Sequence, residues 1–250
     1  PDAIREVLVK QTDVFVKGMD YTDEKTGLAR FMGHGLVTSN GEFWKRQRSM
    51  VAPAFHTQRI SAYAQTMVDY GLQCMLGWQD GDVLDIDDEM MKLTLMVVGR
   101  TLFDTDASAT IESVARVVDV LQKASNTPSL LPSWVPTLLR IRSHFATQAL
   151  DKIIYRFIEA RRQSGEDRGD LLSMLLLSED EDGNRMTDKQ ARDEAVTLFL
   201  AGHETTANTL NWTWWLLSQY PEVEAKLHDE IDRVLAGSPP TLGDLHRLPY

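Results

Sequence analysis

One long apolar stretch without helix breakers limits the fold more than any other feature. No proline occurs between Thr187 and the Tyr220-Pro221 pair. The stretch begins with Thr187 and Gln190 in the spacing of a capping box. Together these signals predict one helix of roughly 30 residues, about 45 Å long at 1.5 Å per residue. Because apolar residues recur along its whole length, we expect this helix to be buried.

The rest of the chain also has the pattern of helices separated by short breakers, with few strand signals. Proline opens the first segment, and Pro53 should end a short helix over 42–51. Further helices are predicted over 57–78, 83–103, 108–125, 137–167, 170–177 and 221–237. The acidic stretch 178–186 is predicted to be a loop within one domain. Without repeats or linkers, residues 1–250 are therefore expected to form a single, mainly α domain.

Composition argues against several classes of function. The chain has 26 basic and 37 acidic residues, a net charge of −11, which disfavours nucleic acid or an anionic membrane as the main partner. Its one cysteine, Cys74, cannot form an intrachain disulfide and is typical of a reducing compartment. No run of 18 apolar residues predicts a transmembrane helix. No signal peptide is visible, although the chain begins with Pro1 instead of methionine. A cytoplasmic location is therefore expected.

The middle of the long helix, AGHETT at 201–206, is poorly suited to simple packing. Gly202 weakens a helix interior by about 1 kcal/mol relative to alanine, and a buried Glu204 would need a partner. His203 and Glu204 do not begin a zinc-protease HExxH motif, because the fifth position is Ala207. A single histidine is more often a core or surface residue than a ligand.

Two interpretations of Glu204 and Thr205 follow from the residues alone. The Thr205 hydroxyl can bond back to the Ala201 carbonyl, and Gly202 leaves one side of the helix bare. Such a groove could hold O2 or water beside a carboxylate that passes protons. Alternatively, the stretch is a kinked core helix with Glu204 paired to an arginine.

Trp44 and Arg48 lie four residues apart on the predicted helix 42–51 and so share one face. An indole N–H beside a guanidinium forms a clamp suited to a carboxylate. The alternative is a surface cation–π pair.

Two other features carry no chemistry. The GHG triplet at 33–35 lacks the strand, turn and helix of a dinucleotide site. Cys74 has the pattern of a small buried residue.

In combination, these stretches resemble the cytochrome P450 family. RDEAVTLFLAGHETT resembles the family's I helix, NGEFWKRQRSMVAPAF its C helix with the Trp-x-x-x-Arg pair, and YPEVEAKLHDEIDRVL its J helix. The order of the stretches also matches, and the resemblance covers nearly the whole chain. It implies a partial cytochrome P450 fold, roughly from the B helix through the J helix, truncated at both ends.

The resemblance implies a haem b cofactor (iron protoporphyrin IX). Trp44 and Arg48 would bind its propionates. Ala201 and Gly202 would lie over the distal face of the haem, together with Thr205. The family's iron ligand is a cysteine in a loop that would follow Tyr250, and Cys74 does not have that sequence context. No metal ligand is therefore expected within this chain, which should be inactive alone.

The resemblance also implies catalytic and substrate-binding residues. Glu204 and Thr205 match the family's acid–alcohol pair, which delivers protons during oxygen activation. Leu36 and Val37 match a loop that shapes the substrate pocket, and Ala201 would border the same pocket. The parent enzyme would insert one oxygen atom of O2 into a hydrophobic small molecule by hydroxylation or epoxidation, with a fatty-acid-like substrate as one option.

Electrons would come from a ferredoxin, a flavodoxin or a flavin reductase. Lys45 and Arg46 could form part of a basic patch for an acidic donor, although solvated helix charges are the commoner explanation. Two other functions remain as alternatives: a helical protein that binds haem or lipid without catalysis, and a scaffold in which GHETT is only a kink. The retained acid–alcohol pair argues against the first, and haem titration would separate the second, because a scaffold would give no Soret band.

Overall fold

The computed structural model describes residues 2–11, 14–105 and 137–250, together with residues 113, 114, 117, 120, 121, 123, 124 and 135. The chain divides into two compact units, which are described separately. The first unit comprises Pro1–Pro53, Ser113–Glu166 and Leu172–Leu198, and the second comprises Ala54–Glu112, Asp167–Leu171 and Phe199–Tyr250. The single-domain organisation stays a prediction.

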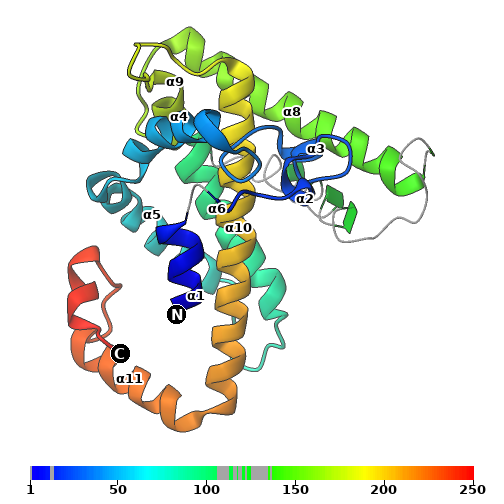
Figure 1. The fold of residues 1–250 in the computed structure, drawn as a ribbon. Coiled ribbons are helices and arrows are strands. Elements are labelled where there is room, and N and C mark those ends of the chain that lie inside the picture. Colours follow the sequence, from blue (N-terminus) through cyan, green and yellow to red (C-terminus); the bar gives the residue numbers. More distant parts are fainter. Residues whose placement is uncertain are drawn as a thin grey trace. The chain divides into compact units, whose positions relative to one another are not determined.

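The first unit is helical (Figure 1). Its elements are α1 (Asp2–Arg5), the π-helical turn η1 (Glu6–Lys10), α2 (Met19–Thr22), α3 (Ala29–Met32), α4 (Gly41–Val51), α8 (Leu138–Ser164), most of α9 (Leu171–Leu177) and the first part of α10 (Asp188–Gln219). As predicted, α4 ends before Pro53, which lies in the 3-10 turn η2 (Ala52–Phe55). The short helices α2 and α3 were not predicted, because four-residue helices carry too little periodicity to detect.

The core of the first unit forms around a stripe on α8. The buried apolar residues of α8 recur at every fourth position: Ala146, Leu150, Ile154 and Ile158. This spacing places them on one face of the helix. They are joined in the core by buried residues of α9 and α10, namely Leu172, Leu175, Ala191, Ala195 and Val196. Full burial of each leucine or isoleucine contributes about 1.5–3 kcal/mol.

Arg192 holds three elements of the first unit together. Its guanidinium is buried and donates to Asp151 Oδ1 of α8 at 2.7 Å and to the Phe31 carbonyl of α3 at 2.9 Å. A third contact, to Asp193 Oδ1, measures 3.0 Å. Bonded on several sides, this charge fixes the start of α10 against α3 and α8.

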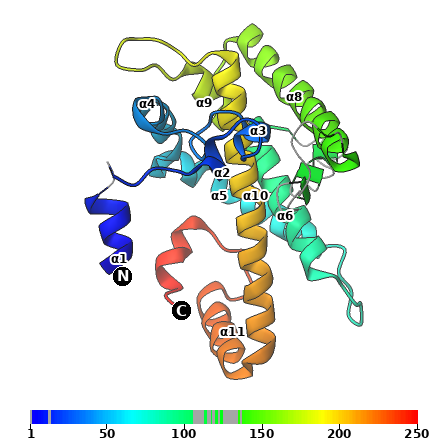
Figure 2. The same cartoon turned by 45° about the vertical axis from the view of Figure 1, so that its right-hand side comes forward.

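The second unit contains α5 (Thr57–Met75), α6 (Ile86–Phe103), the rest of α10, α11 (Pro221–Leu235) and the 3-10 turn η3 (Leu242–Arg247). Figure 2 shows α11 leading into the C-terminal turn η3. The Tyr250 backbone N–H donates to Glu230 Oε1 at 2.9 Å and ties the end of the chain to α11. As predicted, α11 begins at a proline, and Gly237 follows its end with φ +80°.

The length of the predicted long helix is confirmed, but its expected burial is wrong for the part after Ala207, where most residues are exposed. α10 runs for 32 residues, and its capping box is present: Thr187 N donates to Gln190 Oε1 at 2.9 Å, and Gln190 N donates to Thr187 Oγ1 at 3.2 Å. A mainly α fold is also confirmed: apart from one isolated bridge between Glu179 and Arg185, the described part of the chain has no strand pairing. Most of the helix predicted over 108–125 lies outside the described residues. No described helix is long and apolar enough to cross a membrane.

Candidate functional site

The predicted site residues fall in both units. Leu36, Val37, Trp44 and Arg48 belong to the first unit, whereas the 201–205 stretch of α10 belongs to the second.

The middle of α10 has an exposed face and a buried face. Ala201 and Thr205 are exposed, whereas His203 and Ala207 are buried. The Thr205 hydroxyl donates to the Ala201 carbonyl at 2.5 Å, which confirms the expected back-bond. Helical structure nevertheless continues through this point, so the back-bond does not open the helix. The hydroxyl oxygen keeps its lone pairs and can still accept a hydrogen bond from another donor.

Gly202 has a packing role within the second unit. A Cβ added to this glycine would lie 3.3 Å from Val98 Cγ2 of α6, which is tighter than an ordinary contact. The bare side of the helix therefore lets α6 approach closely.

His203 is a core residue. Its ring stacks on Phe199 with centroids 6.2 Å apart. Burial lowers its pKa, and a hydrogen bond to the Met91 backbone only partly opposes this effect. The imidazole therefore favours its neutral form, as expected for a histidine that packs.

Glu204 is half-buried and has no ion-pair or hydrogen-bond partner among the described residues. In this part of the chain no arginine pairs with it, contrary to the kinked-core alternative. A carboxylate without a partner beside a threonine hydroxyl is available to exchange protons.

The polar groups of Trp44 and Arg48 have no hydrogen-bond partner among the described residues. Arg48 is exposed and Trp44 is half-buried on the same face of α4. The cation over the Trp44 ring is Lys17, whose Nζ lies 5.2 Å from the ring centroid. Because two N–H donors one turn apart are left for an anion, these residues fit the carboxylates of a haem.

The loop from Gly33 to Asn40 lies directly on the first turns of α10. A Cβ added at Gly33, where φ is +71°, would lie 2.1 Å from Asp193 Oδ1. At Gly35 it would lie 2.2 Å from Thr197 Oγ1. Since any side chain would collide, the GHG triplet serves close packing of a loop on a helix.

Leu36 and Val37, the predicted pocket residues of this loop, are half-buried. The Leu36 N–H donates to Glu194 Oε2 at 3.1 Å, and Lys17 Nζ donates to the Leu36 carbonyl at 2.7 Å. Burial raises the pKa of Glu194 to about 7. Neither Lys17 nor Glu194 was predicted as a site residue from the sequence, although a glutamate inside the apolar run RDEAVTLFL was a usable signal.

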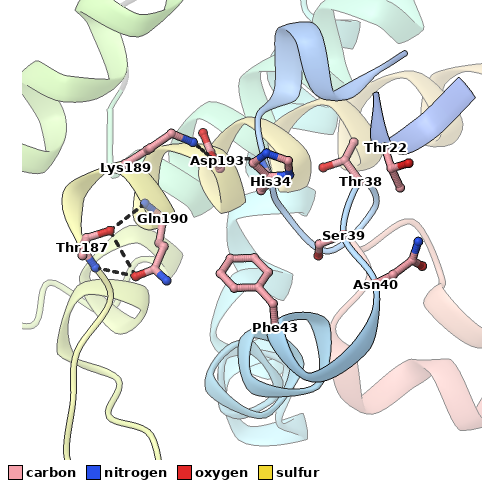
Figure 3. Close-up of a pocket in the computed structure, with 10 residues that line it drawn as sticks. All are labelled: Thr22, His34, Thr38, Ser39, Asn40, Phe43, Thr187, Lys189, Gln190 and Asp193. Atoms are coloured by element: carbon pink, nitrogen blue, oxygen red, sulfur yellow. Dashed lines mark hydrogen bonds and ion pairs between the residues drawn. The ribbon is translucent and has the colours of Figure 1, made fainter. Parts of the chain in front are cut away.

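A cleft of about 500 Å³ opens beside the same loop. Figure 3 shows that Lys189 and Asp193 of α10 approach the loop at His34, while Phe43 comes from α4. Lys189 Nζ and Asp193 Oδ2 are 2.7 Å apart. Leu36 and Val37 do not line this cleft. It is therefore distinct from the predicted substrate pocket.

The predicted basic patch is largely paired. Arg46 Nε contacts Asp180 Oδ2 at 2.6 Å, and Lys45 Nζ contacts Glu42 Oε1 at 2.8 Å. The acidic stretch 178–186 therefore anchors α4 through Asp180. In the second unit, burial raises the pKa of the Cys74 thiol, and a contact to Glu89 adds to this. Cys74 is thus a poor source of thiolate.

Comparison with known proteins identifies the family. The sequence profile described as Cytochrome P450 matches residues 1–250. The chain belongs to the cytochrome P450 family. Among curated relatives of this P450 chain, "Cyclooctat-9-en-7-ol 5-monooxygenase" of Streptomyces melanosporofaciens is 38% identical over 256 residues, covering 100% of this chain and 55% of that protein. "Pentalenene oxygenase" of Streptomyces avermitilis is 34% identical, and the match covers 99% of this chain and 55% of that protein.

Solved structures agree with this assignment. The cytochrome P450DA heme domain matches with a TM-score of 0.77 and 27% identity over 88% of this chain and 50% of its own. Retinoic acid bound cyanobacterial CYP120A1 matches with a TM-score of 0.82 over 99% of this chain and 55% of its own; at 21% identity it shows the fold alone. This P450 chain thus spans about half the length of the relatives it matches.

Proposed function

We propose that the complete protein containing this chain is a haem-dependent monooxygenase. It would insert one oxygen atom of O2 into a hydrophobic small molecule by hydroxylation or epoxidation. The observation that carries this proposal is the Glu204–Thr205 pair on α10, a carboxylate without a partner among the described residues beside an exposed hydroxyl. A scaffold or a carrier has no need of such a pair.

The residues of this chain would bind the cofactor and move protons. Arg48 and Trp44 would hold the haem propionates through their N–H donors. When bound, haem b would supply the iron chemistry that reduces O2. Ala201, with its small side chain, leaves space on the exposed face of α10 for O2 and substrate.

Proton delivery is assigned to the acid–alcohol pair. Glu204 takes a proton from solvent and passes it on, since its carboxylate is half-buried and not engaged by a cation in the described parts of the chain. The Thr205 hydroxyl, which donates to the Ala201 carbonyl in this structure, would turn away from it and hydrogen-bond to the group that receives the proton. Glu204 therefore acts by proton transfer, and Thr205 acts by position and hydrogen bonding.

The relatives' names support an unsaturated, mostly hydrocarbon substrate. Two of them are named for cyclooctat-9-en-7-ol and for pentalenene. Leu36 and Val37, both apolar, would form part of the pocket wall. A fatty acid is the second substrate class to be tested.

An electron donor is required, and we propose a ferredoxin, a flavodoxin or a flavin reductase. Because Lys45 and Arg46 are paired with Glu42 and Asp180, they contribute little to a basic docking patch. The single cysteine supports a cytoplasmic location.

The deciding experiment uses the complete protein, haem and ¹⁸O2, with pentalenene and lauric acid as candidate substrates. We expect a Soret band on haem titration and a product that carries one ¹⁸O atom. A protein that gives no Soret band does not bind haem and is instead a scaffold or a lipid-binding protein. A protein that binds haem but forms no labelled product from either substrate class, or takes its oxygen from water, is not a monooxygenase of the proposed kind.

A further inference from the structure

Leu36 is held by two charged side chains from outside its loop. Its N–H donates to Glu194 Oε2 at 3.1 Å, and its carbonyl accepts from Lys17 Nζ at 2.7 Å. Lys17 Nζ also donates to the Ser39 carbonyl at 2.8 Å. Both backbone polar groups of a predicted pocket residue are therefore fixed by groups far away in the sequence.

Lys17 is itself fixed to the same loop. Its backbone N–H donates to Asn40 Oδ1, and Asn40 Nδ2 donates to the Lys17 carbonyl, both at 3.1 Å. The ammonium also lies over the Trp44 ring. Lys17 is thus positioned by backbone bonds as well as by its charge, so its ammonium is directed at the loop.

The loop covers Glu194. Gly33 lies against Asp193 and Gly35 against Thr197, on either side of Glu194 along α10, and Glu194 is fully buried. Its second oxygen, Oε1, is buried and has no hydrogen-bond partner among the residues that the structure describes. An unpartnered buried carboxylate oxygen is costly when charged and much less so when the group carries a proton.

We propose that Glu194 and Lys17 are positioning residues that hold Leu36 and Val37 on α10, and that the hold is firmest when Glu194 is protonated. The link to substrate binding rests on the proposed function, because only that function makes the loop a wall of the substrate pocket. The hold itself depends on this chain alone.

The charges around Glu194 give the direction of the effect. Burial is the largest influence and raises the pKa of Glu194 to about 7, and Asp193 on the same helix also raises it. The Leu36 N–H and the Lys17 ammonium oppose this rise. Asp193 is itself paired with Arg192 and Lys189.

Opening of the loop would expose Glu194 to water, where the pKa of a glutamate has its ordinary value of 4.5. The closed loop therefore binds the proton more tightly than the open loop does. Closure is most favoured below pH 4.5 and weakens as the pH rises through about 7. Between pH 6 and pH 8 the ratio of closed to open loop should fall by about tenfold.

The test is amide hydrogen exchange of loop 33–40 in the complete protein between pH 6 and pH 8, corrected for the intrinsic exchange rate. In the wild type, we expect protection at Leu36 to fall by about tenfold as the pH rises. Glu194→Gln keeps an acceptor for the Leu36 N–H and cannot ionise. In this variant protection should stay at the wild-type pH 6 level throughout.

Two controls address other titrating groups. His34 lies in the same loop and pairs with Glu24. Glu222 is an exposed glutamate in the first turn of α11. His34→Gln and Glu222→Gln should both keep the pH dependence of the wild type.

Lys17→Met provides a separate readout. Because the ammonium lowers the pKa of Glu194, its removal should move the change in protection to higher pH. The proposal is overturned if Glu194→Gln retains the wild-type pH dependence, or if the change is absent in the wild type. Exchange is read without substrate or turnover, so a failed oxygenation assay would reject the proposed function and leave this inference standing.

Discussion

At Gly35 a single missing side chain decides how closely the loop approaches α10. Its φ is not in the left-handed region, so the requirement is purely steric: an added Cβ would lie 2.2 Å from Thr197 Oγ1 and 2.8 Å from the Asp193 carbonyl oxygen. The threonine can turn away, but the backbone carbonyl cannot. Any side chain at position 35 would therefore force the loop 33–40 away from α10.

We expect Gly35→Ala to lower the free energy of unfolding by about 1–3 kcal/mol, in the range for overpacking of a tight site. Urea denaturation measures the change. The control is Gly71→Ala in α5, where an added Cβ meets open space and helix propensity should increase stability by up to about 1 kcal/mol. Equal stability of the Gly35→Ala variant and the wild type would show that the loop does not depend on this contact.

Thr205 offers a second prediction at the residue scale. Thr205→Ala in the complete enzyme should uncouple the reaction, with more hydrogen peroxide per NAD(P)H and roughly tenfold less product, because a hydroxyl that orders proton delivery is lost. Product and peroxide are measured per electron consumed.

Thr209→Ala is the matched control, since Thr209 is also exposed and bonds back to the Thr205 carbonyl at 2.8 Å. Thr205→Ser should restore coupling. If the Thr205→Ala and Thr209→Ala variants behave alike, the hydroxyl of Thr205 has no special role.

At the scale of the element, α4 has a buried face that packs in the core and an exposed face that is open to a ligand. Gln47, Met50 and Val51 are buried in the first unit, whereas Arg48 is exposed. Arg46 is held by Asp180 at 2.6 Å. One arginine of the helix is therefore structural, and the other is available to a ligand.

Arg48→Ala should weaken haem binding by about tenfold or more, because hydrogen bonds to a charged group contribute about 1.5–3 kcal/mol. The Kd is measured by haem titration of the complete apoprotein, followed at the Soret band. Lys45→Ala, an exposed cation on the same helix, controls for the loss of charge. Unchanged affinity in Arg48→Ala would rule out the propionate clamp.

At the scale of the whole molecule, one buried carboxyl makes stability depend on pH. The pKa of Glu194 is raised from 4.5 to about 7, so the folded state binds its proton more tightly than the unfolded state. The stabilisation is fully present below pH 4.5 and is lost as the pH rises through about 7. At about 1.4 kcal/mol per pH unit, the total loss reaches roughly 3 kcal/mol.

Glu194→Gln removes this titration. Relative to the wild type, we expect the variant to gain roughly 2 kcal/mol of stability between pH 5 and pH 8. Urea unfolding of both proteins at the two pH values measures the difference. A constant difference would mean that Glu194 ionises alike in the folded and unfolded states.

The sequence predicted the helices well because their signals are local. The capping box at Thr187 and Gln190, the proline at the start of α11 and the apolar period of α8 all lie within a few residues of what they determine. The back-bond from Thr205 to Ala201 spans one turn and was predicted for the same reason. The resemblance to the P450 family likewise rested on short contiguous motifs.

Contacts between distant segments were decided by the tertiary structure alone. The GHG triplet carries no local sign that Gly33 and Gly35 pack on α10, and Gly202 none that it faces Val98. The hold on Leu36 needs Lys17 and Glu194 to converge from two different segments. By itself the sequence determined the helical elements and the family, because both depend on neighbouring residues. Only the folded chain decided which charges are buried and what they hold, because burial depends on segments that meet after folding.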